Sequence, residues 1–283
     1  MSLPVDFSPE QYLLLHPDVR YAGMDPTYHY LNHGRFEGRN YKSDGNPLLK
    51  KVRGKFSSDG MTSIHNHDFL SEPRFMAAYD RGIQASGLDY QWYWRVHMGL
   101  WAARTAALKP GDFVECGVNF GFMSSAIMQD LDWNSTGRTF YLLDTFEGVD
   151  DRLLLDEERA GGVVEKCQKW IAEGTYTSSV ERVQANFAEW PGARVIQGVV
   201  PQTLAEIDAE HIAFLHLDMN CTLPEVAAIE YLWDRLVPGA VVLLDDYAYD
   251  GYQPQKEGMD AWAAQRNIPI ASLPTGQGLL IRP

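Results

Sequence analysis

Short apolar runs recur along residues 111–283, and stretches with helical or turn character separate them. Apolar strands that alternate with helical patterns indicate βαβ units, in which helices cover both faces of a parallel sheet. The pattern therefore predicts an α/β fold with a mostly parallel sheet. The five strands expected first are residues 113–115, 139–144, 194–198, 212–218 and 240–246.

The last two apolar runs, residues 270–273 and 278–281, are joined by a short connection that contains Gly276. Such a connection favours a β-hairpin. An antiparallel pair at the end of a parallel sheet is how class I methyltransferase folds finish, whereas a dinucleotide-binding domain continues with a crossover helix. We therefore expect a Rossmann-like, seven-stranded sheet with an antiparallel C-terminal hairpin.

The N-terminal residues predict a small helical module over residues 1–40. Ser8-Pro9-Glu10 is a helix start and Pro17 a stop, and a second helix is expected from Asp25 to about Asn32. Residues 41–60 have no apolar periodicity and are predicted as a linker to a catalytic-type domain over residues 61–283. The module resembles one found beside enzymes of bacterial surface-sugar pathways, and it is either a docked helical hairpin or a protein-interaction tag.

Two aromatic or histidine-rich stretches leave alternatives open. Trp94, His97, Met98 and Trp101 recur at helical spacing, which predicts a helix face packed against the sheet, with an aromatic wall for a substrate as the alternative. The segment 64–68 with its two histidines is an ordinary loop, a lid over a cofactor, or a metal ligand pair without a third ligand. Residues 149–177 are acidic and helical in character and are expected to form an insertion that shapes specificity.

Charge and cysteine content narrow the classes of partner. The 24 basic and 38 acidic residues give 24 − 38 = −14, a net charge that disfavours nucleic acid and anionic membranes as partners. Three scattered cysteines do not make a disulfide framework or a zinc finger, and we interpret them as packing residues in a reducing compartment. No secretory leader and no apolar run of bilayer length is evident, so the expected location is the cytoplasm.

A glycine-spaced turn follows the first expected strand, and it is the first candidate ligand site. Glu115 ends the strand, and Gly117 and Gly121 bracket a loop that leads into a helical pattern at Ser124. Glycines let a backbone approach a nucleotide-like ligand, and a helix N-terminus offers free N–H groups. The spacing Gly-x-x-x-Gly after an acid, in place of Gly-x-Gly-x-x-Gly, favours the cationic S-adenosylmethionine over a dinucleotide.

Acidic residues end four of the expected strands, and the carboxyl ends of parallel strands open on one edge of a sheet. Asp144 suits hydrogen bonds from ribose hydroxyls. Asp218, Asp245 and Asp246 together suit a hard divalent ion such as Mg²⁺, which would lower the pKa of a substrate hydroxyl and position it. His216, two residues before Asp218, is predicted to be a core histidine. The acids expected to converge are Glu115, Asp144, Asp218, Asp245 and Asp246.

Four motifs in this order resemble the macrocin O-methyltransferase family, which methylates sugar hydroxyls with S-adenosylmethionine and Mg²⁺. They are residues 112–118, 143–148, 215–218 and 244–247. The resemblance implies that Asp218, Asp245 and Asp246 bind the metal and that Asp218 acts in catalysis through it. The cofactor-binding residues expected are Glu115, Gly117, Val118, Asn119, Gly121, Ser124, Asp144, Thr145, Phe146 and Gly198.

The chain departs from the family pattern at Asn220, where the family has an acid that is a candidate base. An amide cannot accept the proton. The proton acceptor is then another group, or the metal alone suffices. The alternatives for that group are His65, His67, Tyr247, Tyr249 and Tyr252.

The leading hypothesis is a Mg²⁺-dependent O-methyltransferase that acts on a hydroxyl of a sugar or a glycosylated small molecule. The expected partner is that acceptor, with a second copy of the chain as an open possibility. A non-catalytic S-adenosylmethionine-binding or scaffold protein of a polysaccharide pathway is the alternative from another class. An NAD-linked oxidoreductase is the less favoured enzyme alternative, because the dinucleotide glycine motif is missing.

Overall fold

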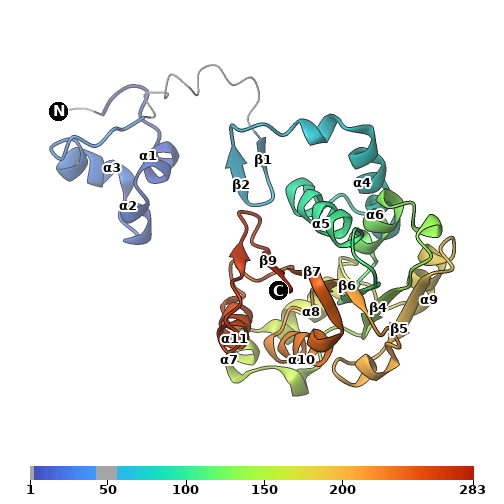
Figure 1. Cartoon of the computed structure of the whole chain (residues 1–283). Coiled ribbons are helices and arrows are strands. Elements are labelled where there is room, and N and C mark those ends of the chain that lie inside the picture. The colour runs from blue at the N-terminus through green and yellow to red at the C-terminus, as the bar shows by residue number, and fades with distance from the viewer. Residues whose placement is uncertain (1–2, 43–55) are drawn as a thin grey trace. The chain divides into compact units, whose positions relative to one another are not determined.

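A seven-stranded sheet with the order β5-β4-β3-β6-β7-β9-β8 is the central element of the computed structural model, which describes residues 3–42 and 56–283 (Figure 1). Strands β3 to β7 are parallel, and β9 pairs antiparallel with β7 and β8. The predicted sheet with its C-terminal hairpin is thus confirmed. The strands are β3 (Asp112–Cys116), β4 (Phe140–Asp144), β5 (Ala193–Gln197), β6 (Ile212–Leu217), β7 (Leu236–Leu244), β8 (Ala271–Ser272) and β9 (Gly278–Ile281).

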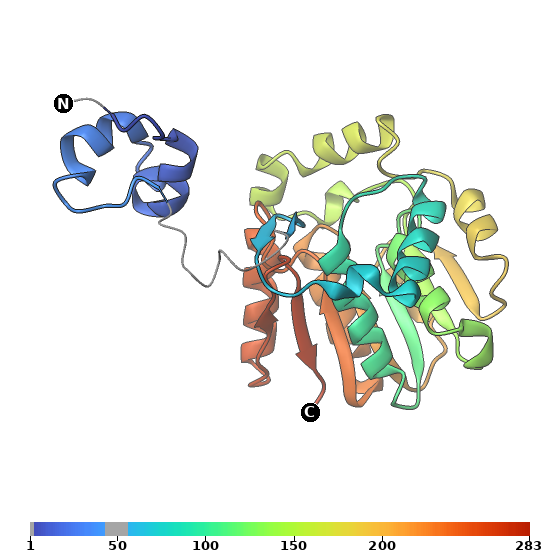
Figure 2. The ribbon, with the colours of Figure 1, turned by 90° about the horizontal axis from the view of Figure 1, so that it is seen from above.

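Helices cover both faces of this sheet, as Figure 2 shows. Successive strand residues point to opposite faces, so Phe113 and Phe214 belong to one apolar core while Val114 and Leu215 belong to the other. The first core lies under α4 (Pro73–Ser86), α5 (Tyr93–Ala106), α6 (Phe122–Asp130) and α9 (Val180–Phe187). The second lies under α10 (Thr222–Leu232) and α11 (Gln253–Ala264). The remaining helices of this unit are α7 (Asp156–Ala160), α8 (Val163–Ala172) and short 3₁₀ turns at Asp68–Ser71, Trp133–Ser135, Asp151–Leu153, Gln202–Glu206 and Trp233–Arg235.

The N-terminal residues form the predicted small helices. Their bounds are α1 (Pro9–Leu15), α2 (Pro17–Tyr21), α3 (Pro26–His29) and a π-helical turn at Tyr30–Gly34. The side chains of Ser8 and Asp25 accept hydrogen bonds from the backbone N–H groups of Gln11 and Tyr28, which caps two helices as the sequence predicts. Pro17 does more than stop α1, because it is also the first residue of α2.

The described residues divide into two units. The first contains the residues up to Phe56 together with Thr62–Asn66, and the second contains Ser57–Met61 and His67–Pro283. Strands β1 (Phe56–Ser58) and β2 (Met61–Ser63) pair with each other. Most of the predicted linker falls on residues 43–55, outside the described residues, so the domain boundaries stay a prediction.

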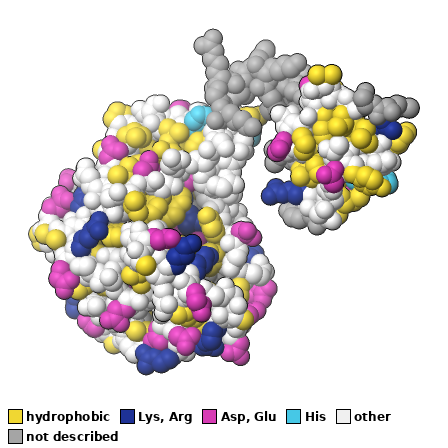
Figure 3. All heavy atoms as spheres, turned by 180° about the vertical axis from the view of Figure 1, so that it is seen from behind, with side chains coloured by type: hydrophobic (Ala, Val, Ile, Leu, Met, Phe, Trp, Pro, Cys, Tyr) yellow, Lys and Arg dark blue, Asp and Glu magenta, His cyan; other side chains and the backbone are white. Residues whose placement is uncertain are grey.

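The surface charges, the cysteines and the helix lengths can be compared with what the composition predicts. Charged side chains of both signs are spread over the face of the larger unit seen in Figure 3. All three cysteines are buried and free, as expected for packing residues. Across residues 3–42 and 56–283, no helix combines the length and the apolar character that a bilayer-spanning segment needs.

The aromatic stripe predicted as the buried face of α5 is confirmed only in part. Trp94 packs against the first core, but Trp101 is 43% exposed and the helix buries Arg95, Gly99 and Leu100. Gly99 permits close approach, since a Cβ there would lie 2.4 Å from the sulfur of Met123. An analysis of apolar periodicity treats arginine as a polar residue. It therefore could not place the buried guanidinium of Arg95 on the packed face of the helix.

Tertiary contacts set two boundaries near the site. Helix α10 begins at Thr222, where the buried carboxylate of Glu158 accepts hydrogen bonds from the N–H and hydroxyl of Thr222 at 2.7 and 2.6 Å. Strand β7 begins at Leu236, before the expected start at residue 240, and contains Pro238 and Gly239, where the pairing register with β6 shifts. A register shift of this kind is where a sheet tolerates proline.

Candidate active site

A cavity of about 370 Å³ opens at the carboxyl ends of the parallel strands, where an α/β sheet holds its ligands. All five acids predicted to converge line it, namely Glu115, Asp144, Asp218, Asp245 and Asp246. Gly117, Val118, Asn119, Thr145 and Gly198 also line the cavity, whereas Gly121, Ser124 and Phe146 are not among its lining residues. The structure thus brings together most of the predicted site.

The backbone conformation of the glycine loop explains why residues 117 and 121 are glycines. Gly117 has φ 92°, and a Cβ there would lie 1.8 Å from the carbonyl oxygen of Asp218. Gly121 has φ 82° and caps the N-terminus of α6 in the left-handed conformation. The glycines therefore let the end of β3 lie directly against the end of β6, so that the loop and Asp218 share one cavity.

Asp144 organises the loop around it. Its Oδ2 accepts hydrogen bonds from the N–H groups of Val118 and Asn119 at 2.7 and 2.8 Å, and its Oδ1 accepts one from Phe146 at 2.8 Å. The hydroxyl of Thr145 lies 3.5 Å from Oδ1 as well. Asp144 therefore holds the loop in shape, and Phe146 takes part through its backbone.

A buried arginine, which the sequence reasoning missed, balances the acids. Arg95 of α5 is 5% exposed, and its guanidinium donates to Asp245 and, at 3.3 Å, to Asp246. The sequence does hold a signal for it: five converging carboxylates require a cation, and an arginine inside an apolar helix requires an acid. Neither signal alone identifies the partner.

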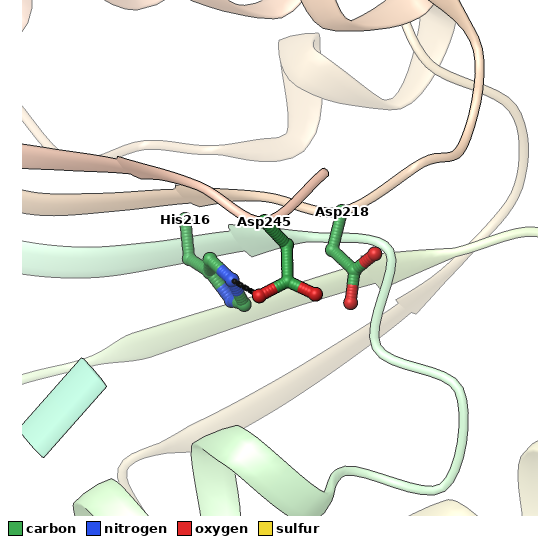
Figure 4. Close-up of side chains that lie close together, drawn as sticks. All are labelled: His216, Asp218 and Asp245. Atoms are coloured by element: carbon green, nitrogen blue, oxygen red, sulfur yellow. Dashed lines mark ion pairs between the residues drawn. The ribbon is translucent and has the colours of Figure 1, made fainter. Parts of the chain in front are cut away.

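His216, Asp218 and Asp245 lie close together, as Figure 4 shows. One ligand atom from each lies within 4.8 Å of the others. The Nδ1 of His216 is 2.8 Å from Glu115, while its Nε2 is 3.6 Å from Asp245 and has no hydrogen-bond partner among the described residues. His216 is thus buried, as predicted, and it also borders the acid cluster.

These residues fit a divalent cation. The Asp218 carboxylate makes a long contact, 3.5 Å to the amide of Asn220, and the nearby Nε2 of His216 makes no hydrogen bond among the described residues and lies 3.6 Å from Asp245. Two carboxylates and an imidazole form a set of donors that divalent metals accept. The set differs from the predicted one, because His216 lies where Asp246 was expected and Asp246 contacts Arg95. The identity of the metal ligands stays a prediction.

The environment sets different pKa values for the three acids. Burial acts to raise the pKa of Asp245, but Arg95 and His216 outweigh it and lower that pKa to about 2. Burial and the charge of Asp245 raise the pKa of Asp246 to about 6. Burial and both neighbouring acids raise the pKa of Asp218 well above its usual value. Asp218 and Asp246 therefore accept a proton more readily than Asp245 does.

The candidate bases named from the sequence separate into two groups. Tyr249 and Tyr252 line the cavity, whereas Tyr247, His65 and His67 are not among its lining residues. Burial, followed by the charges of Asp246 and Asp218, raises the pKa of Tyr252 far above its usual value, so its phenol is a poor proton acceptor.

The predicted insertion at 149–177 forms one wall of the cavity. Lys166 and Trp170 of α8 and Tyr176 after it line the space, and the ammonium of Lys166 lies 4.9 Å from the ring centres of Trp170 and Tyr252. The wall is therefore aromatic with one basic group. The aromatic residues that line the cavity with large rings are Tyr90, Trp92, Phe120, Phe122, Trp170, Tyr176, Tyr249 and Tyr252.

Curated and solved proteins resemble the chain in this region. It is 30% identical over 153 residues to the 8-demethyl-8-(2,3-dimethoxy-alpha-L-rhamnosyl)-tetracenomycin-C 4'-O-methyltransferase of Streptomyces olivaceus, a match that covers 50% of the chain and 54% of that protein. The chain thus spans about half the length of this curated relative.

Two solved structures share the fold. The O-methyltransferase NovP aligns with TM-score 0.55 and 20% identity over 71% of this chain and 88% of that one. The calicheamicin methyltransferase CalS11 aligns with TM-score 0.50 and 18% identity over 77% and 97%. The family model for macrocin O-methyltransferases matches residues 102–272, the part of the chain that contains the glycine loop and all five acids. The chain therefore belongs to the macrocin O-methyltransferase (TylF) family, whose membership implies S-adenosylmethionine as the methyl donor.

Proposed function

We propose that the protein is an S-adenosylmethionine-dependent O-methyltransferase, assisted by a divalent cation such as Mg²⁺, whose acceptor is a hydroxyl of a sugar or a glycosylated small molecule. The observation that carries the proposal is the convergence of the glycine loop and the buried acids on one cavity. The rhamnosyl compound named for the Streptomyces olivaceus relative supports a sugar-containing acceptor. The pocket volume lies within the range of small-molecule sites, about 300–1,000 Å³.

The cofactor half of the site fits a cationic methyl donor. Glu115 lines the cavity with a buried Oε2 that has no hydrogen-bond partner among the described residues. Such an atom suits the amino group of a methionine moiety, because a buried acceptor without a donor is costly. Gly117 lets the end of β6 lie against the loop, and Asp144 lines the cavity as the proposed acceptor for ribose hydroxyls. Glu115, Asp144 and the loop between them would orient the donor.

The acceptor half of the site is built around Asp218. Bound S-adenosylmethionine supplies the methyl group, and a divalent cation held by Asp218, Asp245 and either His216 or Asp246 would lower the pKa of the acceptor hydroxyl. Asp218, which lines the cavity, is the proposed acceptor of the proton as the O–CH₃ bond forms and the S–CH₃ bond breaks. Asn220 beside it donates to its carboxylate.

The charges around the cavity favour a neutral or cationic acceptor over an anionic one. Arg95, Lys166 and His216 are the basic residues among the described lining residues, and they face a larger number of carboxylates. Burial acts to lower the pKa of His216, but its contacts with Asp245 and Glu115 outweigh burial and raise that pKa to about 10. An anionic acceptor would meet this excess of negative charge at short range. The acidic residues that line the cavity are Glu115, Asp144, Asp150, Asp218, Asp245 and Asp246.

A second candidate function is a non-catalytic S-adenosylmethionine-binding or scaffold protein. Two observations favour it: Asn220 stands where the family has an acid, and Arg95 already neutralises Asp245 and Asp246. The NAD-linked alternative has no support, because the sheet closes with an antiparallel hairpin and the chain belongs to a methyltransferase family.

Asp218→Asn provides the direct test of catalysis. We expect methyl transfer from labelled S-adenosylmethionine to a panel of glycosylated acceptors to fall by about 10²–10⁴-fold, the range that a proton-transfer group contributes. Calorimetry should show S-adenosylmethionine affinity unchanged within about threefold, because the loop of the cofactor half is intact. The exposed Asp234→Asn is the matched control.

The results distinguish the proposed methyltransferase from the non-catalytic scaffold protein. Absence of S-adenosylmethionine binding by the unaltered chain, with and without Mg²⁺, would refute the proposal. Binding without transfer to any acceptor would favour the scaffold function. Transfer that persists at full rate in Asp218→Asn would remove Asp218 from the mechanism.

A further inference from the structure

Arg95 has polar and aromatic partners on several sides of its guanidinium. Its guanidinium donates to Asp245 and Asp246, and its NH2 group lies 3.5 Å from the carbonyl oxygen of Thr275. The guanidinium carbon also lies 5.5 Å from the ring centre of Trp92 and 4.8 Å from that of Tyr249. Carboxylates and aromatic rings therefore surround the charge, and both kinds of partner attract a guanidinium.

The contacts of Asp245 show that Arg95 and a divalent cation would use the same carboxylate. Oδ2 of Asp245 accepts from Arg95, and Oδ1 accepts from Gln277 at 3.0 Å and lies 3.6 Å from the Nε2 of His216. Both oxygens thus have partners in the structure. A metal ion that takes Asp245 as a ligand must share or displace one of them.

The charges around Asp245 and Asp246 also indicate that Arg95 and a divalent cation would compete. Asp245 is 5% exposed and Asp246 is 7% exposed, so their charges are poorly solvated and need a cation nearby. Arg95 supplies that charge to both acids in the described structure, and His216 lies 3.6 Å from Asp245 as a second basic group. A divalent ion would supply it again, and two cations close together in a poorly solvated site repel each other strongly.

We propose that Arg95 is a resident counter-cation of the active site, which holds Asp245 and Asp246 in place without metal and competes with a divalent cation for Asp245. The inference rests on the proposed function, since it concerns the metal half of that site. It implies that the protein keeps an ordered acid cluster without metal, and that metal occupancy is weaker than the acids alone would give.

The test measures the binding of Mn²⁺ alone, by calorimetry or electron paramagnetic resonance, without S-adenosylmethionine or acceptor. We expect Arg95→Gln to lower the Mn²⁺ dissociation constant at least about tenfold, because the competing charge is gone. Arg95→Lys keeps the positive charge but cannot donate to both carboxylates as a guanidinium does. It should therefore lower the Mn²⁺ dissociation constant by less than Arg95→Gln does. Arg104→Gln is the matched control, because Arg104 lies on the same helix and pairs with Asp130 away from the cavity; it should leave the constant unchanged.

A second readout is the melting temperature without activity. Arg95→Gln should melt below the unaltered chain without metal, because the two acids lose their counter-charge, and Mn²⁺ should raise its melting temperature more than that of the unaltered chain. If Arg95→Gln does not fold, Arg95→Lys still decides, since a dissociation constant equal to or higher than that of the unaltered chain contradicts the inference. Absence of Mn²⁺ binding in every folded variant contradicts it as well.

The experiment also keeps the two proposals apart. Unchanged Mn²⁺ affinity in Arg95→Gln, with methyl transfer by the unaltered chain intact, overturns the counter-cation role alone. The expected gain in Mn²⁺ affinity, in a chain that binds no S-adenosylmethionine, supports the role of Arg95 and overturns the proposed methyltransferase.

Discussion

Glu225 shows how a single buried acid can hold the turn that carries Asp218 and Asn220. Its Oε1 accepts hydrogen bonds from the N–H of Met219 at 3.0 Å and from the side-chain amide of Gln255 at 2.7 Å. The residue is 3% exposed, and burial raises its pKa to about 8. Glu225 therefore fixes the backbone directly after Asp218 and is largely protonated in the folded chain near neutral pH.

The raised pKa makes a prediction about stability. Between the ordinary glutamate pKa of 4.5 and about 8, the folded chain keeps the proton of Glu225 while the unfolded chain has lost it. The free energy of unfolding should therefore fall as the pH rises through this window, by up to several kcal/mol, since one pKa unit corresponds to about 1.4 kcal/mol. Glu225→Gln keeps the acceptor oxygen, removes the titration and should gain stability relative to the unaltered chain as the pH rises.

Urea unfolding of both chains at about pH 5 and about pH 8 checks this sign. The exposed Glu206→Gln is the control, and its difference from the unaltered chain should be the same at both pH values. A Glu225→Gln variant whose relative stability does not increase towards the higher pH would show that the folded chain does not hold this carboxyl protonated.

Residues at strand ends could be predicted from the sequence, whereas their buried partners could not. Asp144, Asp218 and Asp245 follow apolar strands, and parallel strands end on one edge, so their convergence follows from the pattern alone. Arg95 and Glu225 lie inside helices. Their significance depends on which acid or backbone group the packed helix meets, and neither periodicity nor spacing contains that information.

At the scale of elements, Glu158 connects α7 of the insertion to the start of α10. One carboxylate oxygen accepts from the N–H and hydroxyl of Thr222, and the other accepts from the N–H of Leu155 at 2.8 Å. Glu158 is 6% exposed, so these donors have little access to water as substitutes. The contact holds the insertion that forms one wall of the cavity.

Removal of this carboxylate should loosen the insertion. Glu158→Ala leaves buried donors without an acceptor, which costs about 1–3 kcal/mol of unfolding free energy. We expect the KM for the acceptor to rise by more than the S-adenosylmethionine dissociation constant, because the glycine loop is not part of the contact. Steady-state kinetics and urea unfolding measure both effects, with the exposed neighbour Glu157→Ala as the control. Equal behaviour of the two variants would contradict the connecting role.

The order and type of elements were predictable because apolar periodicity reports which segments are buried on two faces. The antiparallel hairpin at the C-terminus followed from a short glycine-containing connection. The buried face of α5 was not predictable, since Gly99 and Arg95 define it through contacts with α6 and with the strand ends. The start of α10 depends on a contact of the same kind, because its cap comes from Glu158 in a distant segment.

At the scale of the whole molecule, the candidate site belongs to one of the two units. All residues that line the 370 Å³ cavity lie between Tyr90 and Tyr252, within the second unit. Both apolar cores that support the sheet are also built from residues of this unit. We therefore propose that the N-terminal module is separate from methyl-donor binding, which leaves docking or a protein interaction as its role.

A chain of residues 56–283 tests this separation. We expect it to bind S-adenosylmethionine with a dissociation constant within about threefold of that of the full chain, and to melt at a similar temperature, because the cavity and both cores are intact. Calorimetry and thermal unfolding of the two chains give the comparison. Gly117→Ala in the shorter chain is the control for a damaged site: a Cβ 1.8 Å from the Asp218 carbonyl oxygen must displace the loop and abolish binding. A shorter chain that folds but binds the donor more than about tenfold more weakly would show that the N-terminal residues contribute to the site.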